Sequence, residues 1–250
     1  MPVLKIENLH KRFGGIKAVD GPTMIFQAGE ITGLIGPNGS GKSTLVNLIT
    51  GMFPYDSGLV CIGDHTRLSK IKGQDLPEFG ITRTFQDIRL FEQMPVLDNI
   101  LVVTTSRSVI GSLFEKHKKY HLDIAEKVLK HVGLWEKRHN LAKELSYGQR
   151  KLLEIARVLA LNEDGQGAIH VVLFDEPFAG LFPEMIKIVS DTLKLLREQG
   201  KVVVLIEHNM DIIRDLSDKV IVLDAGKVIA EGKPEKVLSQ ANVIEAYLGK

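Results

Sequence analysis

Nine consecutive residues, GPNGSGKST at 36–44, have the types and the spacing needed to hold phosphate groups. A strand-like run, EITGLIG, precedes them, and a helical run from Lys42 to Ile49 follows. In that setting the backbone N–H groups of the helix start face the phosphates, the lysine neutralises them and the serine hydroxyl serves Mg²⁺. We therefore predict a nucleoside triphosphate site made by Gly36, Pro37, Asn38, Gly39, Ser40, Gly41, Lys42, Ser43 and Thr44.

A second apolar run, VVLFDEP at 171–177, ends in two neighbouring carboxylates. Beside a phosphate loop, Asp175 is the expected partner of Mg²⁺ through water. Glu176 stands one position further, where a carboxylate can accept a proton from an attacking water. A solvated acidic pair at a strand end is the plainer alternative. Gln86, and His208 at the end of the run KVVVLIEH, are undistinguished on their own.

The stretch LSYGQ at 145–149 stands where a long helical run begins. Ser146 as N-cap and Gln149 three residues later predict a capping box. Such a box explains these two residues but not Gly148, because glycine costs up to about 1 kcal/mol in a helix. The glycine therefore indicates a second role for this helix start.

Alternating strand-like and helical runs must position these residues. Short strands and turns fill the opening third, a charged helical segment follows at roughly 99–142, and from Ile169 onward buried strands alternate with helices. This alternation predicts an α/β fold with a mostly parallel sheet covered by helices. The polar stretch NEDGQG at 162–167 is too rich in turn residues to be helical.

Composition narrows the class of protein further. The 250 residues include 44% hydrophobic and 25% charged side chains, as in an ordinary globular domain. A formal charge of +1 gives no electrostatic case for nucleic acid, and the single Cys61 excludes a disulfide framework. No run approaches the ~18 apolar residues of a membrane span, so we expect any work at a membrane to be done from outside the bilayer.

The order of these motifs resembles the nucleotide-binding subunit of ATP-binding-cassette (ABC) transporters, over essentially the whole chain. LSYGQ discriminates best, because phosphate loops occur in many NTPases, whereas this signature before a helix belongs to cassette ATPases. The resemblance implies a P-loop NTPase core with an N-terminal antiparallel β subdomain. It also implies one ABC ATPase domain, 1–250, with the core and β subdomain at 1–98 and 162–250 and a helical subdomain at about 99–161.

The same resemblance implies a role for each motif residue, with ATP and Mg²⁺ as ligands. Phe13 would stack on adenine, although it could be an ordinary strand-end aromatic. Gln86 would reach Mg²⁺ and the attacking water, Glu176 would be the general base, and His208 would bind the terminal phosphate and orient that water. The metal ligands would be Ser43, Gln86 and Asp175. Ser146, Gly148 and Gln149 would face the terminal phosphate held by a second subunit, where the glycine lets backbone N–H groups approach closely.

Several details resemble the branched-chain amino-acid uptake group: RTFQDIRLF at 83–91, Tyr147 in the signature, AGLFP, IEHNM and the ending EAYLGK. Urea or amide importers and lipopolysaccharide exporters share some of them and stay open, as does a cassette ATPase that transports nothing. The resemblance implies an identical or paralogous second ATP-binding subunit and integral membrane permease subunits as partners. It also implies a substrate-binding protein that acts indirectly, and a location on the cytoplasmic side of the cell (inner) membrane.

Three features fit the pattern less well or not at all. Phe182 stands where many cassettes carry Asp in the turn after the carboxylates, so signalling across the dimer through that turn is open. The apolar residues Leu90, Phe91 and Met94 are either core or a docking surface for a membrane subunit, and the resemblance favours docking. His117 and His121 have metal-compatible spacing, but the lysines around them predict a solvated helix face.

Overall fold

The computed structural model describes residues 3–63, 66–68, 73, 76, 78–104, 119–163 and 170–248. The chain forms two compact units. The first comprises residues 1–83, 169–176 and 192–250, and the second comprises residues 84–168 and 177–191. Helix α6 (Pro183–Glu198) begins in the second unit and ends in the first.

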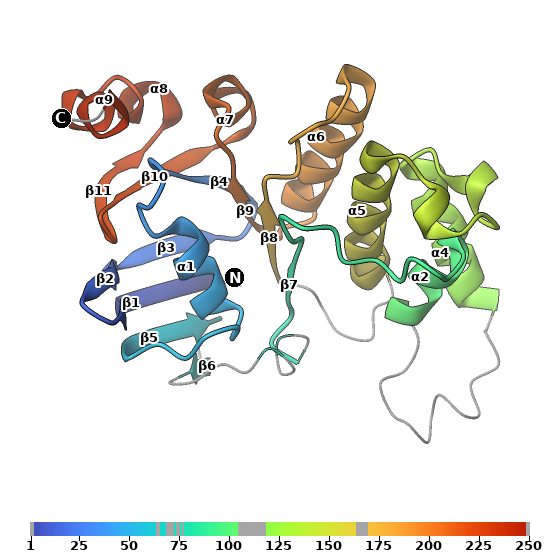
Figure 1. Cartoon of the computed structure of the whole chain (residues 1–250), viewed down its shortest axis with the longest axis horizontal. Helices are drawn as coiled ribbons and strands as arrows, with labels where there is room; N and C mark the ends of the chain where they lie inside the picture. The colour runs from blue at the N-terminus through green and yellow to red at the C-terminus, as the bar shows by residue number, and fades with distance from the viewer. Residues whose placement is uncertain are drawn as a thin grey trace. The chain divides into compact units, whose positions relative to one another are not determined.

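The described part of the first unit contains two sheets (Figure 1). Their strands are β1 (Val3–Phe13), β2 (Ile16–Asp20), β3 (Met24–Gln27), β4 (Glu30–Ile35), β5 (Ser57–Ile62), β6 (Thr66–Leu68), β7 (Ile81–Arg83), β8 (Val171–Asp175), β9 (Val202–Ile206), β10 (Lys219–Asp224) and β11 (Lys227–Gly232). The antiparallel sheet has the order β2–β1–β5–β6, and β3 also pairs with β1. The other sheet has the order β11–β10–β4–β9–β8–β7 and is parallel except for the β10–β11 pair.

The parallel sheet confirms the α/β prediction. All five residues of β8 and all five of β9 are buried, as expected for apolar strands covered on both faces. Since these two strands and β4 run parallel and adjacent, their carboxyl ends meet at one edge. That edge carries the phosphate-loop sequence after β4, the two carboxylates at the end of β8 and His208 after β9.

Helix α1 (Lys42–Ile49) lies in the core of the first unit. It buries Leu45, Val46, Leu48 and Ile49 in an apolar cluster with residues of both sheets. Thr50 is the C-cap of the helix, and its hydroxyl donates to the carbonyl of Val46. The apolar face of α1 thus anchors the segment that begins with Lys42 against both sheets.

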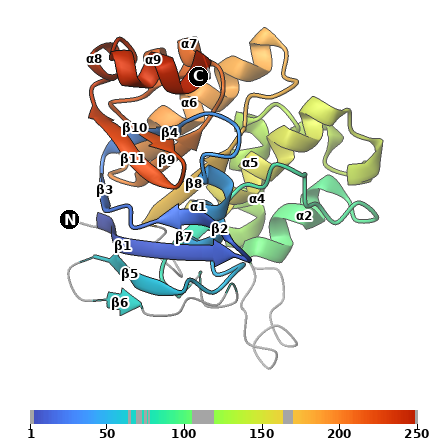
Figure 2. The same ribbon diagram turned by 60° about the vertical axis from the view of Figure 1, so that its left-hand side comes forward.

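The described residues of the first unit also include helices α7 (Met210–Leu216), α8 (Pro234–Val237) and α9 (Ala241–Leu248). Asn209 caps α7, because its side-chain oxygen accepts from the backbone N–H groups of Asp211 and Ile212. Figure 2 shows α8 and α9 together beside β11, with which both are in contact. Among the described residues, no helix combines the length and the apolar character that a membrane span requires.

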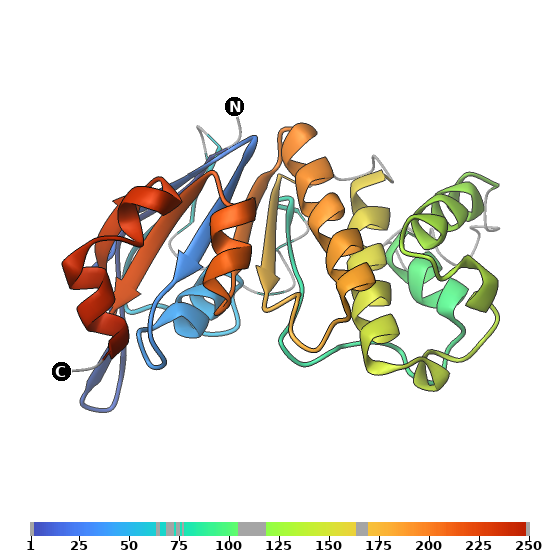
Figure 3. The same ribbon diagram turned by 90° about the horizontal axis from the view of Figure 1, so that it is seen from above.

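The second unit is helical where it is described. It contains α2 (Val96–Thr104), α4 (Lys119–His131), α5 (Tyr147–Glu163), the first half of α6, and the short 3₁₀ turns η2 (Trp135–Lys137) and η3 (Ala142–Glu144). Helices α2, α4 and α5 pack against one another, and Figure 3 shows α2 in green beside α4 in yellow-green. Apolar side chains of α4 and α5, including Ile124, Val128, Leu152 and Ile155, are buried there.

The structure corrects two expectations about this unit. Asn162 and Glu163 are the last residues of α5, so the stretch NEDGQG is helical at its start, and its remaining residues lie outside the described part. His121 is only 1% exposed instead of facing solvent, because it lies on the same face of α4 as Ile124 and Ala125. His117 lies outside the described residues.

Candidate nucleotide site

The phosphate loop connects β4 to α1, and its glycines are required by its shape. Gly36 and Gly41 have φ values of 151° and 103°. A Cβ at Gly36 would lie 2.1 Å from the carbonyl oxygen of Leu223, and one at Gly41 would lie 2.4 Å from that of Ala18. Gly39, at φ 80°, faces open space and is exposed. Side chains are thus excluded where the loop meets Leu223 of β10 and Ala18 of β2. The tip of the loop, at Gly39, is exposed and carries no side chain.

Lys42 turns back into this loop. Its Nζ donates to the carbonyl oxygens of Gly36, at 2.7 Å, and Pro37, at 3.0 Å, and the residue is 6% exposed. Burial lowers the pKa of Lys42, while the charges of Glu176 and Asp175 oppose this shift. The lysine therefore lies in the electrostatic field of Asp175 and Glu176, the two carboxylates with predicted roles in Mg²⁺ binding and catalysis. Ser43, the next residue, is exposed at the helix start.

Asp175 is the last residue of β8 and is 5% exposed. Its carboxylate pairs with the guanidinium of Arg83, with 3.1 Å between Oδ2 and Nη2. Burial raises the pKa of Asp175, and the charge of Arg83 opposes that rise. The other guanidinium nitrogen of Arg83 donates to the side chains of Asn47 and Thr50 at the end of α1. Arg83 thereby ties the predicted magnesium ligand to the helix of the phosphate loop.

Glu176 and His208 lie side by side at the sheet edge. The distance between Glu176 Oε1 and His208 Nε2 is 3.0 Å. Glu176 has a φ of 48°, which non-glycine residues rarely adopt, and its N–H donates to the carbonyl of Ile206. His208 is held between buried Glu207 and the helix cap Asn209. Two residues that the sequence treats separately thus form one hydrogen-bonded pair.

Phe13 ends β1 with its ring 44% exposed, as adenine stacking would need. The ring meets that of Phe53 edge to face, with centroids 5.8 Å apart at 80°. Lys11 Nζ lies 5.4 Å from the Phe13 ring, and Asp56 holds the strand end by accepting from Lys11 Nζ and from the Arg12 backbone. The hydrogen bond from Lys11 is the main cause that lowers the pKa of Asp56, and the hydrogen bond from the Arg12 backbone lowers that pKa further.

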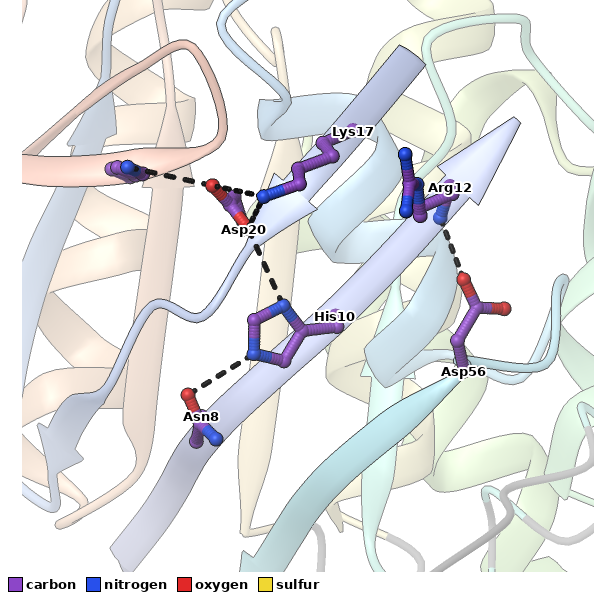
Figure 4. Close-up of polar contacts among 7 residues, drawn as sticks. Asn8, His10, Arg12, Lys17, Asp20 and Asp56 are labelled. Carbon is purple, nitrogen blue, oxygen red and sulfur yellow. Dashed lines mark hydrogen bonds and ion pairs between the residues drawn. The ribbon is translucent and has the colours of Figure 1, made fainter. Parts of the chain in front are cut away.

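The pairing of β1 with β2 has its own polar contacts (Figure 4). His10 lies between Asn8, at 3.1 Å from its Nε2, and Asp20, at 3.5 Å from its Nδ1. Asp20 also pairs with Lys17, whose hydrogen bond is the main cause that lowers the pKa of the carboxyl. Since β2 also contacts Gly41 through Ala18, these contacts connect the Phe13 strand to the phosphate loop.

The carboxyl-terminal helix α9 also reaches the phosphate loop. Burial raises the pKa of Tyr247 to about 12, and a hydrogen bond with the backbone of Gly36 opposes the rise. The sequence offered only the ending EAYLGK as a point of resemblance and gave no reason to place Tyr247 beside Gly36.

The signature LSYGQ lies in the second unit, and its capping box is confirmed. The backbone N–H of Gln149 donates to Ser146 Oγ at 3.3 Å, and the Ser146 N–H donates to Gln149 Oε1 at 3.1 Å. Gly148 is buried, and a Cβ there would lie 2.6 Å from Sδ of Met185. Packing within the unit therefore gives Gly148 a reason that the sequence did not reveal.

Tyr147 and Gln86 occupy different surroundings in this unit. The Tyr147 ring is 46% exposed and lies against Gly180 in the turn after the carboxylates, since a Cβ at Gly180 would be 3.0 Å from its Cε1. Phe182, two residues further, is 70% exposed. Gln86 is exposed on the loop that precedes α2. Its predicted role toward the first unit remains a prediction.

Comparison with known proteins places this geometry in a family. A family model for ABC transporters matches residues 19–179, which is more than half of the chain. The chain belongs to the ABC transporter family. A second model, for branched-chain amino acid ATP-binding cassette transporters, matches residues 227–250. The predicted resemblance is thus confirmed, and the chain is an ABC-type ATPase.

Individual ABC proteins are similar to this cassette over nearly all of their length. The high-affinity branched-chain amino acid transport ATP-binding protein LivG of Escherichia coli K12 is 34% identical over all of this chain and 98% of that protein. The crystal structure of the ADP conformation of MJ1267, an ABC transporter cassette, covers all of both chains at 35% identity with a TM-score of 0.84. A dimeric post-hydrolysis structure of the cassette MJ0796, bound to ADP and Pi, covers 92% of this chain and 98% of that chain at 26% identity and a TM-score of 0.77.

Proposed function

We propose that the chain is the ATP-hydrolysing subunit of an importer for branched-chain or other amino acids. The observation that carries this proposal is the match of residues 227–250 to the branched-chain amino acid cassette model, on a chain that is similar throughout to LivG. Urea or amide uptake, lipopolysaccharide export and non-transport roles have no comparable support.

ATP binding would use the bare tip of the phosphate loop. Backbone N–H groups at 39–44 and the start of α1 would surround the phosphates, since a helix amino terminus attracts anions. Lys42 would exchange its loop carbonyl partners for phosphate oxygens, a change that its flexible stem permits. Phe13 would stack on adenine with its exposed face while Phe53 supports its edge.

The side chains around the loop fit a magnesium ion that is shared with the nucleotide. Mg²⁺ prefers oxygen ligands and usually keeps water and substrate phosphate oxygens in its shell. The exposed hydroxyl of Ser43 and the carboxylate of Asp175 are of this type, and Gln86 would add an amide oxygen. The described residues hold no cluster of His, Cys, Asp or Glu that would bind a metal alone. When bound, Mg²⁺ would neutralise charge on the phosphates.

Glu176 and His208 would handle the attacking water. His208 Nε2 can donate to Oε1 of Glu176, which leaves the second carboxylate oxygen to accept a proton from water. The same histidine, at the end of β9, would contact the terminal phosphate. Both side chains are held by backbone constraints at the sheet edge, which keeps the base in place before substrate arrives.

A second ATP-binding subunit would complete the site. Ser146 and the helix start at 147–149 would face the terminal phosphate bound by that subunit. ATP would favour the closed dimer only through contacts made there and lost on opening. Closure and reopening would drive permease subunits, docked at Leu90, Phe91 and Met94, from the cytoplasmic side of the membrane. Phe91 is 46% exposed, as docking requires.

Reconstitution tests this proposal. The chain is co-purified with its permease subunits, placed in proteoliposomes and supplied with binding protein and candidate solutes. Leucine, isoleucine or valine with the binding protein should stimulate ATP turnover several-fold and drive uptake, whereas urea should do neither. Stimulation by urea or acetamide alone would reject amino-acid import.

A further inference from the structure

The loop that carries Gln86 is held against helix α5, within the second unit, by the buried carboxylate of Glu154. The backbone N–H of Phe85 donates to Oε1 of Glu154, on helix α5, at 3.1 Å. The backbone of Arg89 hydrogen-bonds to the same carboxylate. These two points bracket residues 86–88, so Glu154 holds the loop on both sides of Gln86.

A neighbouring arginine strengthens the attachment. Arg157, one turn further along α5, donates from its guanidinium to the carbonyl oxygen of Arg89. The same guanidinium lies 5.5 Å from the ring centroid of Phe91. Glu154 and Arg157 therefore hold a backbone donor and a backbone acceptor of the same loop, and each also offsets the charge of the other.

The following part of the loop has a separate anchor. Asn99 on α2 is fully buried and exchanges hydrogen bonds with both backbone groups of Phe91, at 2.9 and 3.1 Å. It also donates to the carbonyls of Met94 and Pro95. Asn99 fixes residues 91–95, whereas Glu154 and Arg157 hold the part of the loop around Gln86.

Burial of the Glu154 carboxylate would lower the stability of the fold if the loop did not supply hydrogen bonds to it. The residue is 7% exposed and stands between buried Leu153 and Ile155 in an otherwise apolar stretch of α5. Burial raises its pKa to about 7, and the hydrogen bond from Phe85 is the largest opposing cause. A buried carboxylate is tolerated only when it is hydrogen-bonded, and Glu154 accepts from backbone amides of the loop.

We infer that Glu154 is a positioning residue for hydrolysis: it sets the conformation of Gln86 through the backbone of Phe85 and Arg89 and does not touch the nucleotide. This inference rests on the proposed function, because it requires Gln86 to act on Mg²⁺ and water. It assigns the glutamate in LLEIAR a task that helix formation does not explain.

The kinetic test uses the full chain with Glu154→Ala, Glu154→Gln, Gln86→Ala and the double variant Gln86→Ala with Glu154→Ala. Glu154→Ala should lower kcat for ATP at least tenfold with less than a twofold change in KM. Glu154→Gln, which keeps one acceptor oxygen, should recover much of that loss. In the Gln86→Ala background, Glu154→Ala should lower kcat less than twofold further. Val158→Ala, in the buried face of the same helix, is the control for general destabilisation and should keep wild-type kcat.

Amide hydrogen exchange gives a readout that does not depend on turnover. In Glu154→Ala, the amides of Phe85 and Arg89 should exchange at least tenfold faster, while the amides of Phe91 and of the interior of α5 keep their wild-type rates. Glu154→Gln, which keeps an acceptor oxygen, should show a smaller increase at Phe85 and Arg89. Additive kinetic losses, or unchanged exchange at Phe85 and Arg89, would overturn the inference and leave the ATPase proposal intact. A Gln86→Ala variant with normal kcat would reject the role of Gln86 and the inference with it.

Discussion

Gly148 should accept a side chain at a lower cost in stability once Met185 has been shortened. A Cβ at Gly148 would lie 2.6 Å from Sδ of Met185 and 3.4 Å from Cδ2 of Leu181. Overpacking of this kind costs about 1–3 kcal/mol, whereas alanine is favoured over glycine inside a helix by about 1 kcal/mol. Gly148→Ala should therefore lower the free energy of unfolding by roughly 0–2 kcal/mol. In a Met185→Ala background the obstacle is gone, and the same substitution should be neutral or stabilising.

The chain offers a local probe for this experiment. Trp135 is the single tryptophan and lies in the same unit as Gly148 and Met185. Urea unfolding of the wild type, both single variants and the double variant, followed by tryptophan fluorescence, completes a double-mutant cycle. The expected coupling between the two positions is about 1–3 kcal/mol. Additivity within ~0.5 kcal/mol would refute the packing argument, and the glycine would then need another explanation, such as approach to a phosphate.

Three further outcomes follow from the site. Lys42→Ala should weaken binding of a non-hydrolysable ATP analogue at least about tenfold, because a charge-assisted hydrogen bond to phosphate is lost; unchanged affinity by calorimetry would refute its role. Arg83→Met should destabilise the first unit by about 3–5 kcal/mol, since it leaves Asp175 buried without its cation, and adding Asp175→Asn should restore part of the loss in thermal unfolding. Because burial raises the pKa of Glu154 from 4.5 to about 7, the folded chain keeps a proton that the unfolded chain releases. Relative to Glu154→Gln, the wild type should lose roughly 3 kcal/mol of unfolding free energy as pH rises from about 4.5 to 7, and parallel pH curves for the two proteins would contradict the shift.

Local signals in the sequence predict much of the site. The bounds of α1 agree with the helical run expected from Lys42 to Ile49, and α6 and α7 lie where strands and helices are expected to alternate after Ile169. These helices have apolar faces at helical spacing and clear starts, such as the Asn209 cap. The capping box of Ser146 and Gln149 also follows from residues three positions apart. The order of motifs on parallel strands is enough to gather Lys42, Asp175 and His208 at one sheet edge.

Contacts between residues far apart in sequence could not be predicted in this way. Arg83 and Asp175 are 92 positions apart, and nothing in the spacing of either motif indicates their ion pair. Met185 opposite Gly148 and the loop amides opposite Glu154 are similar cases. His121 shows the same limit, because nearby lysines suggest solvent while the helix face that carries it is buried. A motif can therefore be recognised from its own residues, but the residues that it contacts depend on tertiary packing.

The most direct test of ATP-driven closure uses Glu176→Gln. Glutamine removes the base but keeps an oxygen for the 3.0 Å contact with His208 and leaves the phosphate loop and signature intact. With ATP and Mg²⁺, size-exclusion chromatography with light scattering should find the variant as a dimer that retains two ATP molecules, while ADP leaves it monomeric. A variant that stays monomeric with ATP and hydrolyses it at the wild-type rate would contradict the account.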